Sequence, residues 1–145
     1  MAVTVRGTRG ETLEEFARRQ TADLLRRMSF QANRACRLKD EGSVHDLRVA
    51  IRRLQRCVRL FEQFLPEPRS KKLRSALGRL LDLASEVRNR DIAIGILRRS
   101  KMPGTSRLER ALEAERRAAE RKLLAELESW ARKNQQRKWR ARLRL

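Results

Sequence analysis

Basic side chains between residues 45 and 59 repeat with the period of an α-helix. They are spaced by three or four residues, so at about 100° per residue they share one side of a helix. With a rise of about 1.5 Å per residue, the row would be about 21 Å long. A planar guanidinium can donate two hydrogen bonds to one phosphate, so this spacing predicts a surface that binds an extended polyanion. The basic row consists of His45, Arg48, Arg52, Arg56 and Arg59, with Arg53 on its flank.

Charged rows on helices are usually solvated surface, and this is the alternative interpretation of the basic row. Solvated faces normally mix acids with bases, as the glutamates over 109–128 do with the Arg and Lys residues around them. On the helix of the basic row, Asp46 is the one acid before Glu62, so the arginines are not neutralised there. Two roles stay open for His45: a further donor to the anion, or a hydrogen bond to a backbone carbonyl at the helix start.

Catalysis and metal binding lack the residues that they need. The pair His45-Asp46 is similar to a metal-binding pair, but such a site needs further ligands, and His45 is the only histidine. No glycine-rich loop precedes a predicted helix, and no nucleophile lies beside a residue that could act as its base. Cys36 and Cys57 lack CxxC spacing, so we expect buried, reduced thiols. We therefore predict no catalytic residue, no metal, no cofactor and no enzyme activity.

The helix that carries the basic row must bury its opposite side. Apolar residues there are spaced by three and four, which is the pattern of a core-facing stripe. We expect Ser43 to cap this helix, with Asp46 as the acid three residues later, and we expect the helix to end near Pro66. The stripe consists of Leu47, Ile51, Leu54, Val58, Phe61 and Leu65.

Caps and apolar spacing predict three further helices. A capping box at 12–15 opens a helix that reaches about residue 38. A third helix begins at Ser70 with a stripe over 73–87, and a second capping box at 106–109 opens a fourth after a Pro-Gly turn. The predicted core face of the first helix is Leu13, Phe16, Gln20, Leu24, Met28, Ala32 and Ala35.

Composition favours an all-α protein with an anionic partner. The 145 residues suit one domain, and 6 Gly, 3 Pro and no Tyr favour helices over sheets. The formal charge of +19 makes the chain repel itself unless a polyanion or counterions gather on it. We expect a flexible lead-in over 1–11, a four-helix up-down bundle over 12–132, and a basic tail or an extension of the fourth helix over 133–145. There is no apolar run for a transmembrane segment and no signal-peptide core, so we expect a cytoplasmic protein.

Two stretches of the chain resemble signature segments of the CHAD family. VHDLRVAIRRLQRCVRLF at 44–61 is similar to the family pattern V-H-x-[LM]-R-V-x-x-R-R-L-R. EVRNRDIAIGIL at 86–97 is similar to the later R-D-x-D-V segment, with Arg88 and Asp91 at matching positions and Asn89 where an Asp often stands. The resemblance covers about 13–127. It implies an all-helical, non-enzymatic module that binds inorganic polyphosphate and can accompany a triphosphatase domain.

The later segment extends the predicted site. Arg88 and Asp91 fall beside the core stripe of the third helix, where an isolated charge is costly. Asp91 should therefore form a structural ion pair or anchor an arginine of the basic row, while Arg88 contacts the ligand. The predicted polyphosphate-binding residues are His45, Arg48, Arg52, Arg53, Arg56, Arg59, Arg88 and Arg90.

The family module usually has two helical halves, and this chain resembles one of them. A homodimer would restore the second half, and polyphosphate binding would bring the cytoplasmic protein to polyphosphate granules.

Two other functions compete with polyphosphate binding. The net charge would also support sequence-independent nucleic-acid binding. Alternatively, Trp139, Leu143 and Leu145, which lie among arginines, could dock the chain as a scaffold on acidic proteins or membrane surfaces.

Overall fold

The computed structural model describes residues 10–145, so most of the predicted lead-in over 1–11 lies outside the described residues. Within that range the chain is all-α, as predicted, with no strand. It has five α-helices rather than four, and one short 3-10 helix. The elements are α1 (Leu13–Leu38), α2 (Glu41–Leu60), η1 (Glu62–Phe64), α3 (Arg69–Ser100), α4 (Ser106–Arg132) and α5 (Gln135–Arg142).

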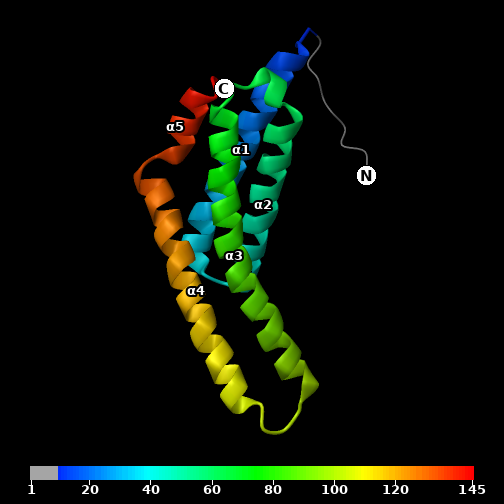
Figure 1. Ribbon diagram of the computed structural model, residues 1–145, viewed down its shortest axis with the longest axis vertical. Helices are drawn as coiled ribbons and strands as arrows, with labels where there is room; N and C mark the ends of the chain where they lie inside the picture. Colours follow the sequence, from blue (N-terminus) through cyan, green and yellow to red (C-terminus); the bar gives the residue numbers. More distant parts are fainter. Residues whose placement is uncertain (1–9) are drawn as a thin grey trace.

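Neighbouring helices pack in chain order, α1 on α2, α2 on α3 and α3 on α4. Helix α3 is the longest at 32 residues, and its second half continues beyond the turn that joins α1 to α2. Among the described residues, this part of α3 packs against α4 alone, so an α3–α4 arm projects from the bundle (Figure 1). Helix α5 folds back beside the bundle at the opposite end and contacts α1 and α4. None of the helices described has an apolar stretch that could cross a membrane.

The core lies where α1, α2 and α3 meet. The stripe predicted on the helix of the basic row is buried at Leu47, Ile51, Leu54 and Val58, all of which have no exposed surface. The stripe on α3 is buried from Leu73 to Val87. Burial of each such side chain stabilises the fold by about 1.5–3 kcal/mol relative to an exposed one. The apolar stripe of α2 therefore holds the opposite, basic side outward.

The capping box of α1 is confirmed, and so are Met28, Ala32 and Ala35 of its predicted core face, but the first half of that face is wrong by one position. Thr12 and Glu15 exchange side-chain and backbone hydrogen bonds, as expected. Leu13 is 59% exposed, whereas Thr21 is fully buried. The hydroxyl of Thr21 donates to the carbonyl of Ala17 at 2.7 Å, which satisfies a polar side chain inside the core. The buried face is Ala17, Thr21, Leu25, Met28, Ser29, Ala32 and Ala35.

The caps predicted for the later helices are wrong. Helix α2 begins earlier than expected, because Asp40 is its N-cap and accepts a hydrogen bond from the backbone N–H of Ser43 at 2.7 Å. Hydrogen bonding to this carboxylate holds the pKa of Asp40 below its usual range. Helix α3 begins at Arg69 rather than being capped by Ser70. At α4, no side chain caps the N-terminus, and Glu109 forms an ion pair with Arg98 instead of a capping box.

Residues after Lys133 neither extend α4 nor form a loose tail. Asn134 takes a positive φ of 48°, a conformation that Asn tolerates better than most residues, and the chain turns there into α5. Trp139 is 6% exposed, and Leu143 is completely buried in the core. These two side chains are therefore part of the fold, which corrects the expectation that they form an exposed docking surface.

Candidate functional site

The basic row lies on the outer side of α2, between two flanking helices. On one flank, Asp46 accepts a hydrogen bond from Arg34 of α1 at 2.6 Å. On the other flank, Arg48 Nε donates to Ser85 Oγ of α3 at 3.2 Å. Arg48 is half-buried by this contact. The rest of the row is exposed to solvent, namely His45, Arg52, Arg53, Arg56 and Arg59.

No carboxylate within residues 10–145 forms an ion pair with an arginine of the basic row. The acids nearest to it have other partners: Asp46 pairs with Arg34, and Glu62 pairs with Arg74 at 3.5 Å. The side chain of His45 also forms no hydrogen bond within this range, so the bond to a carbonyl at the helix start, one of its two expected roles, is absent there. The row is therefore a ribbon of uncompensated positive charge rather than a structural salt-bridge network.

Arg48 shows the effect of that uncompensated charge. Partial burial lowers the pKa of its guanidinium, and the positive charges of Arg52 and Arg88 lower it further. Like charges therefore meet at the N-terminal part of the row. A phosphate placed there would gain from all three guanidinium groups at once.

An open groove of about 660 Å³ adjoins the C-terminal part of the row between α2 and α3. Arg56 and Arg59 line it from α2 and Arg74 lines it from α3, together with Glu62, the acid that pairs with Arg74. Sequence patterns did not indicate Arg74, because the spacing within one helix does not fix its register against another. The groove widens the basic surface from a single helix to the junction of two.

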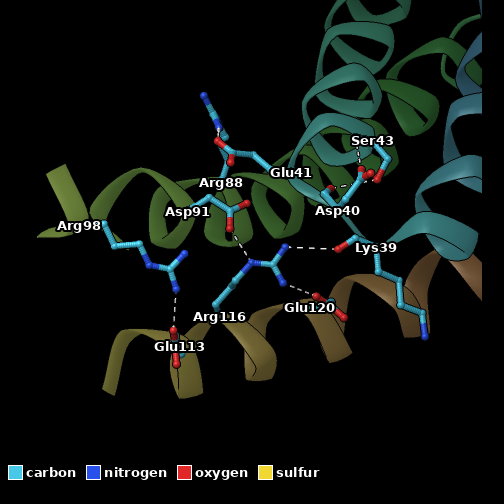
Figure 2. Close-up of polar contacts among 10 residues, drawn as sticks. All are labelled: Lys39, Asp40, Glu41, Ser43, Arg88, Asp91, Arg98, Glu113, Arg116 and Glu120. Atoms are coloured by element: carbon cyan, nitrogen blue, oxygen red, sulfur yellow. Dashed lines mark hydrogen bonds and ion pairs between the residues drawn. The ribbon is translucent and has the colours of Figure 1, made fainter. Parts of the chain in front are cut away.

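Arg88 and Arg90 differ from the basic row because each already has an acidic partner. Arg88 pairs with Glu41 at the start of α2, as Figure 2 shows. Arg90 pairs with Glu86 in its own helix and with Glu115 of α4 at 3.4 Å. Arg88 thus lies on the side of α3 that faces the basic row, whereas Arg90 lies on the side that faces α4. The structure brings together the row and Arg88, but not Arg90.

Asp91 forms a structural ion pair, which is one of its two expected roles, although its partner comes from α4. Arg116 donates from Nε to Asp91 Oδ1 at 2.5 Å, from Nη1 to Glu120 and from Nη2 to the carbonyl of Lys39 at 3.4 Å. The side chain of Asp91 is only 9% exposed. Figure 2 shows this cluster joining the α1–α2 turn to both helices of the arm. It is part of the scaffold that holds the α1–α2 turn against the α3–α4 arm.

The glutamates of α4, which the sequence places among Arg and Lys residues of the same helix, mainly neutralise arginines of α3. Glu109 and Glu113 both pair with Arg98, at 2.6 and 2.8 Å. Among the residues that the structure describes, the pair of Arg116 and Glu120, four residues apart, is the only ion pair within α4. The acids of α4 thus compensate the arm and leave the basic row uncovered.

A family model described as CHAD domain matches residues 15–145. No match to the chain was found among curated proteins or among solved structures. Both signature-like segments, 44–61 and 86–97, fall inside the matched range.

No group of three or more His, Cys, Asp and Glu residues that could hold a metal ion occurs within residues 10–145. The arrangement described above can bind a long anion through several guanidinium groups at once.

Proposed function

The chain belongs to the CHAD family, and from this premise we propose that it binds inorganic polyphosphate through the basic row without catalysing a reaction. CHAD domains are linked to polyphosphate binding and are generally binding rather than catalytic domains. The observation that carries the proposal is the exposed row of arginines on α2, which has no acidic partner within the described residues.

Polyphosphate suits this row because its charge repeats along a chain. Arginines spaced by one helical turn meet successive phosphates, and each planar fork can donate two hydrogen bonds. Arg74 extends the contact surface across the groove, and His45 adds a donor at the N-terminal end. Many weak contacts of this kind give binding that is multivalent and salt-dependent.

Arg88 and Arg90 have secondary places in the proposed site. Arg88 would exchange Glu41 for a phosphate, since Glu41 is exposed and the charge of Arg88 already acts on Arg48. Arg90 would have to leave two carboxylates, Glu86 and Glu115, and it lies on the other side of α3. We therefore rank Arg88 as a ligand that joins the site when the anion binds, and Arg90 as the weakest of the predicted ligands.

Nucleic acid is the competing anion, because a net charge of +19 attracts any duplex through counterion release. Trp130 and Trp139 are buried and cannot stack on unpaired bases. A docking scaffold is disfavoured in the same way, since Trp139 and Leu143 are core residues.

A second copy of the chain is our candidate for the missing half of the family module. The cytoplasm, at polyphosphate granules, is the location that we propose.

A competition titration separates these anions. Labelled long-chain polyphosphate would be displaced by unlabelled polyphosphate, orthophosphate, double-stranded DNA or heparin at near-physiological salt. We expect tight binding of long-chain polyphosphate and negligible binding of orthophosphate, because only the long anion spans the row. Equal affinities for DNA and polyphosphate would contradict the proposal and leave a nonspecific polyanion binder.

A further inference from the structure

Polar side chains bridge α2 and α3 at regular steps along the line where the two helices pack. Arg48 of α2 donates from Nε to Ser85 Oγ of α3 at 3.2 Å. Seven residues further along α2, Gln55 Nε2 donates to the carbonyl of Arg74 at 3.5 Å. Gln55 also faces Gly78, where a Cβ would lie 3.7 Å from its amide nitrogen. We call this line of contacts the α2–α3 seam. It adjoins the basic row, because Arg48 belongs to both.

An ion pair closes each end of the α2–α3 seam. Glu41, the first residue of α2, pairs with Arg88 of α3, as Figure 2 shows. Glu62, which follows the end of α2, pairs with Arg74 of α3 at 3.5 Å and lines the groove at the C-terminal part of the row. The α2–α3 seam therefore has an acid at each end, and each acid holds one arginine of α3.

Arg74 and Arg88 lie on the same side of α3. They are fourteen residues apart, which at about 100° per residue is close to four full turns. The same spacing separates His45 from Arg59 at the two ends of the basic row. With a rise of about 1.5 Å per residue, the two α3 arginines are about 21 Å apart along the helix. They therefore match the basic row in length from the other side of the α2–α3 seam.

Both glutamates can leave their arginines without disturbing the core. The side chains of Glu41 and Glu62 are 61% and 59% exposed, and neither carboxylate has another partner within residues 10–145. The side chains of Arg88 and Arg74 are themselves 25% and 33% exposed, so an anion in solvent can reach them. Exposed ion pairs of this kind contribute little to stability. Exchange of either carboxylate for a phosphate therefore leaves the fold intact.

We propose that Glu41 and Glu62 regulate the polyphosphate site as internal competitors, each holding one α3 arginine in the free chain and releasing it to the anion. This regulation rests on the proposed binding of polyphosphate and extends the path of the anion into the α2–α3 seam. A long anion bound to the basic row keeps its phosphates tethered close to both α3 arginines, so it competes at a high effective concentration. Orthophosphate has no such tether, and it meets an attached carboxylate at either end.

Calorimetric titration of the full chain with long-chain polyphosphate measures this competition. Glu41→Gln and Glu62→Gln should each raise the affinity by about two- to fivefold, the range that corresponds to the loss of an exposed ion pair. The two gains should multiply in the double variant, because the long anion reaches both α3 arginines. For tripolyphosphate the gains should not multiply, since this anion is far shorter than the distance between Arg74 and Arg88. Circular dichroism checks that each variant is folded.

Asp82→Asn controls for the loss of negative charge alone. Asp82 is an exposed acid of α3 between Arg74 and Arg88, and it forms no ion pair in the part of the chain that the structure describes. Its replacement removes the same charge from α3 without freeing an arginine, so the gain in affinity should be clearly smaller. An equal gain from Asp82→Asn would mean that the two glutamates act through diffuse charge, and it would overturn the proposal.

A double-mutant cycle tests the pairing itself. In an Arg74→Ala background, Glu62→Gln should gain no more than Asp82→Asn gains in the unaltered chain, because Glu62 no longer has an arginine to hold. Glu41→Gln should keep its gain in that background, since its partner Arg88 is intact. A gain from Glu62→Gln that survives Arg74→Ala would overturn the proposal.

The same titrations separate the competition from the proposed function. If the unaltered chain does not bind long-chain polyphosphate, the proposed function is contradicted and the competition with it. If the chain binds polyphosphate but neither Glu41→Gln nor Glu62→Gln raises the affinity above the Asp82→Asn control, the proposed function stands and the competition alone is refuted.

Discussion

Single arginines of the basic row can be removed with little risk to the fold. Arg52 and Arg56 are exposed and have no acidic partner within the described residues, so replacing them leaves no carboxylate unpaired. Each contact with a phosphate is a charge-assisted hydrogen bond worth about 1.5–3 kcal/mol. We expect Arg52→Ala with Arg56→Ala to weaken polyphosphate binding by about 10-fold to several hundredfold, since the two losses are not fully additive.

A control on α4 removes the same charge from another face. Arg117 and Arg121 are exposed and lie four residues apart, as Arg52 and Arg56 do. Arg117→Ala with Arg121→Ala should therefore cause a much smaller loss of affinity, measured by the same titration after circular dichroism has shown both double variants to be folded. Equal losses from the two double variants would mean that affinity comes from diffuse charge rather than from the row.

The two cysteines give a prediction about reactivity. Burial raises the pKa of the Cys57 thiol, although a hydrogen bond with Thr21 opposes the shift, and burial also raises the pKa of Cys36. Both thiols should therefore stay protonated at neutral pH, and alkylation by iodoacetamide should accelerate only above the pH range of an ordinary thiol. We expect Cys36 to react faster than Cys57, because Cys36 is half-buried and Cys57 is buried.

Mass spectrometry of peptides from the alkylated protein would measure both rates, with the chain in guanidinium chloride as the reference. A rate at Cys57 equal to that of the denatured chain would contradict its place in the core. Both cysteines are free, as expected, but the expected burial holds only for Cys57, since Cys36 is half-buried.

At the scale of helices, the ion pair of Arg116 with Asp91 connects α4 to α3. Arg116→Ala would leave a carboxylate that is 9% exposed without its partner, and would release the carbonyl of Lys39 in the α1–α2 turn. Breaking a buried pair in this way costs about 3–5 kcal/mol. We expect a clear fall in the midpoint of chemical unfolding, at the lower end of that range because Arg116 is 19% exposed.

Arg98→Ala is the matched control for this variant. Arg98 also pairs with two acids of α4, but its side chain is 60% exposed, so its loss should lower the unfolding midpoint much less than the loss of Arg116. Similar shifts for both variants would show that the Arg116 cluster behaves as ordinary surface charge.

Local periodicity explains what sequence alone could predict about these elements. The basic row and the stripe from Leu47 to Val58 both lie on α2, so their spacing was sufficient. The predicted end near Pro66 was wrong, because α2 ends at Leu60 and Phe61 and Leu65 lie beyond it. The partners of Arg88 and Asp91 come from other helices, and the register between helices is set by packing that no single-helix pattern contains. The break at Asn134 had a weak signal, because Asn is among the few residues that adopt a positive φ readily, but basic residues on both sides hid the core role of Trp139.

At the scale of the whole molecule, acids and bases are unevenly distributed. The arm of α3 and α4 contains several ion pairs, whereas the outer side of α2 has none within the described residues. With a net charge of +19, two copies should repel each other when these faces approach without an anion between them. A homodimer that completes the family module should therefore depend on polyphosphate.

Light scattering coupled to size-exclusion chromatography tests this dependence. We expect the free chain to have the monomer mass of 17.1 kDa, and long-chain polyphosphate to produce a species with two copies. Excess polyphosphate distinguishes two models, because copies bound independently would separate onto different anions, whereas a dimer enclosing one anion would persist. The variant Arg52→Ala with Arg56→Ala should remain monomeric under both conditions, since it lacks charge that would bind the shared anion. A dimer that forms without polyphosphate, or one that dissolves in its excess, would contradict a site completed by a second copy.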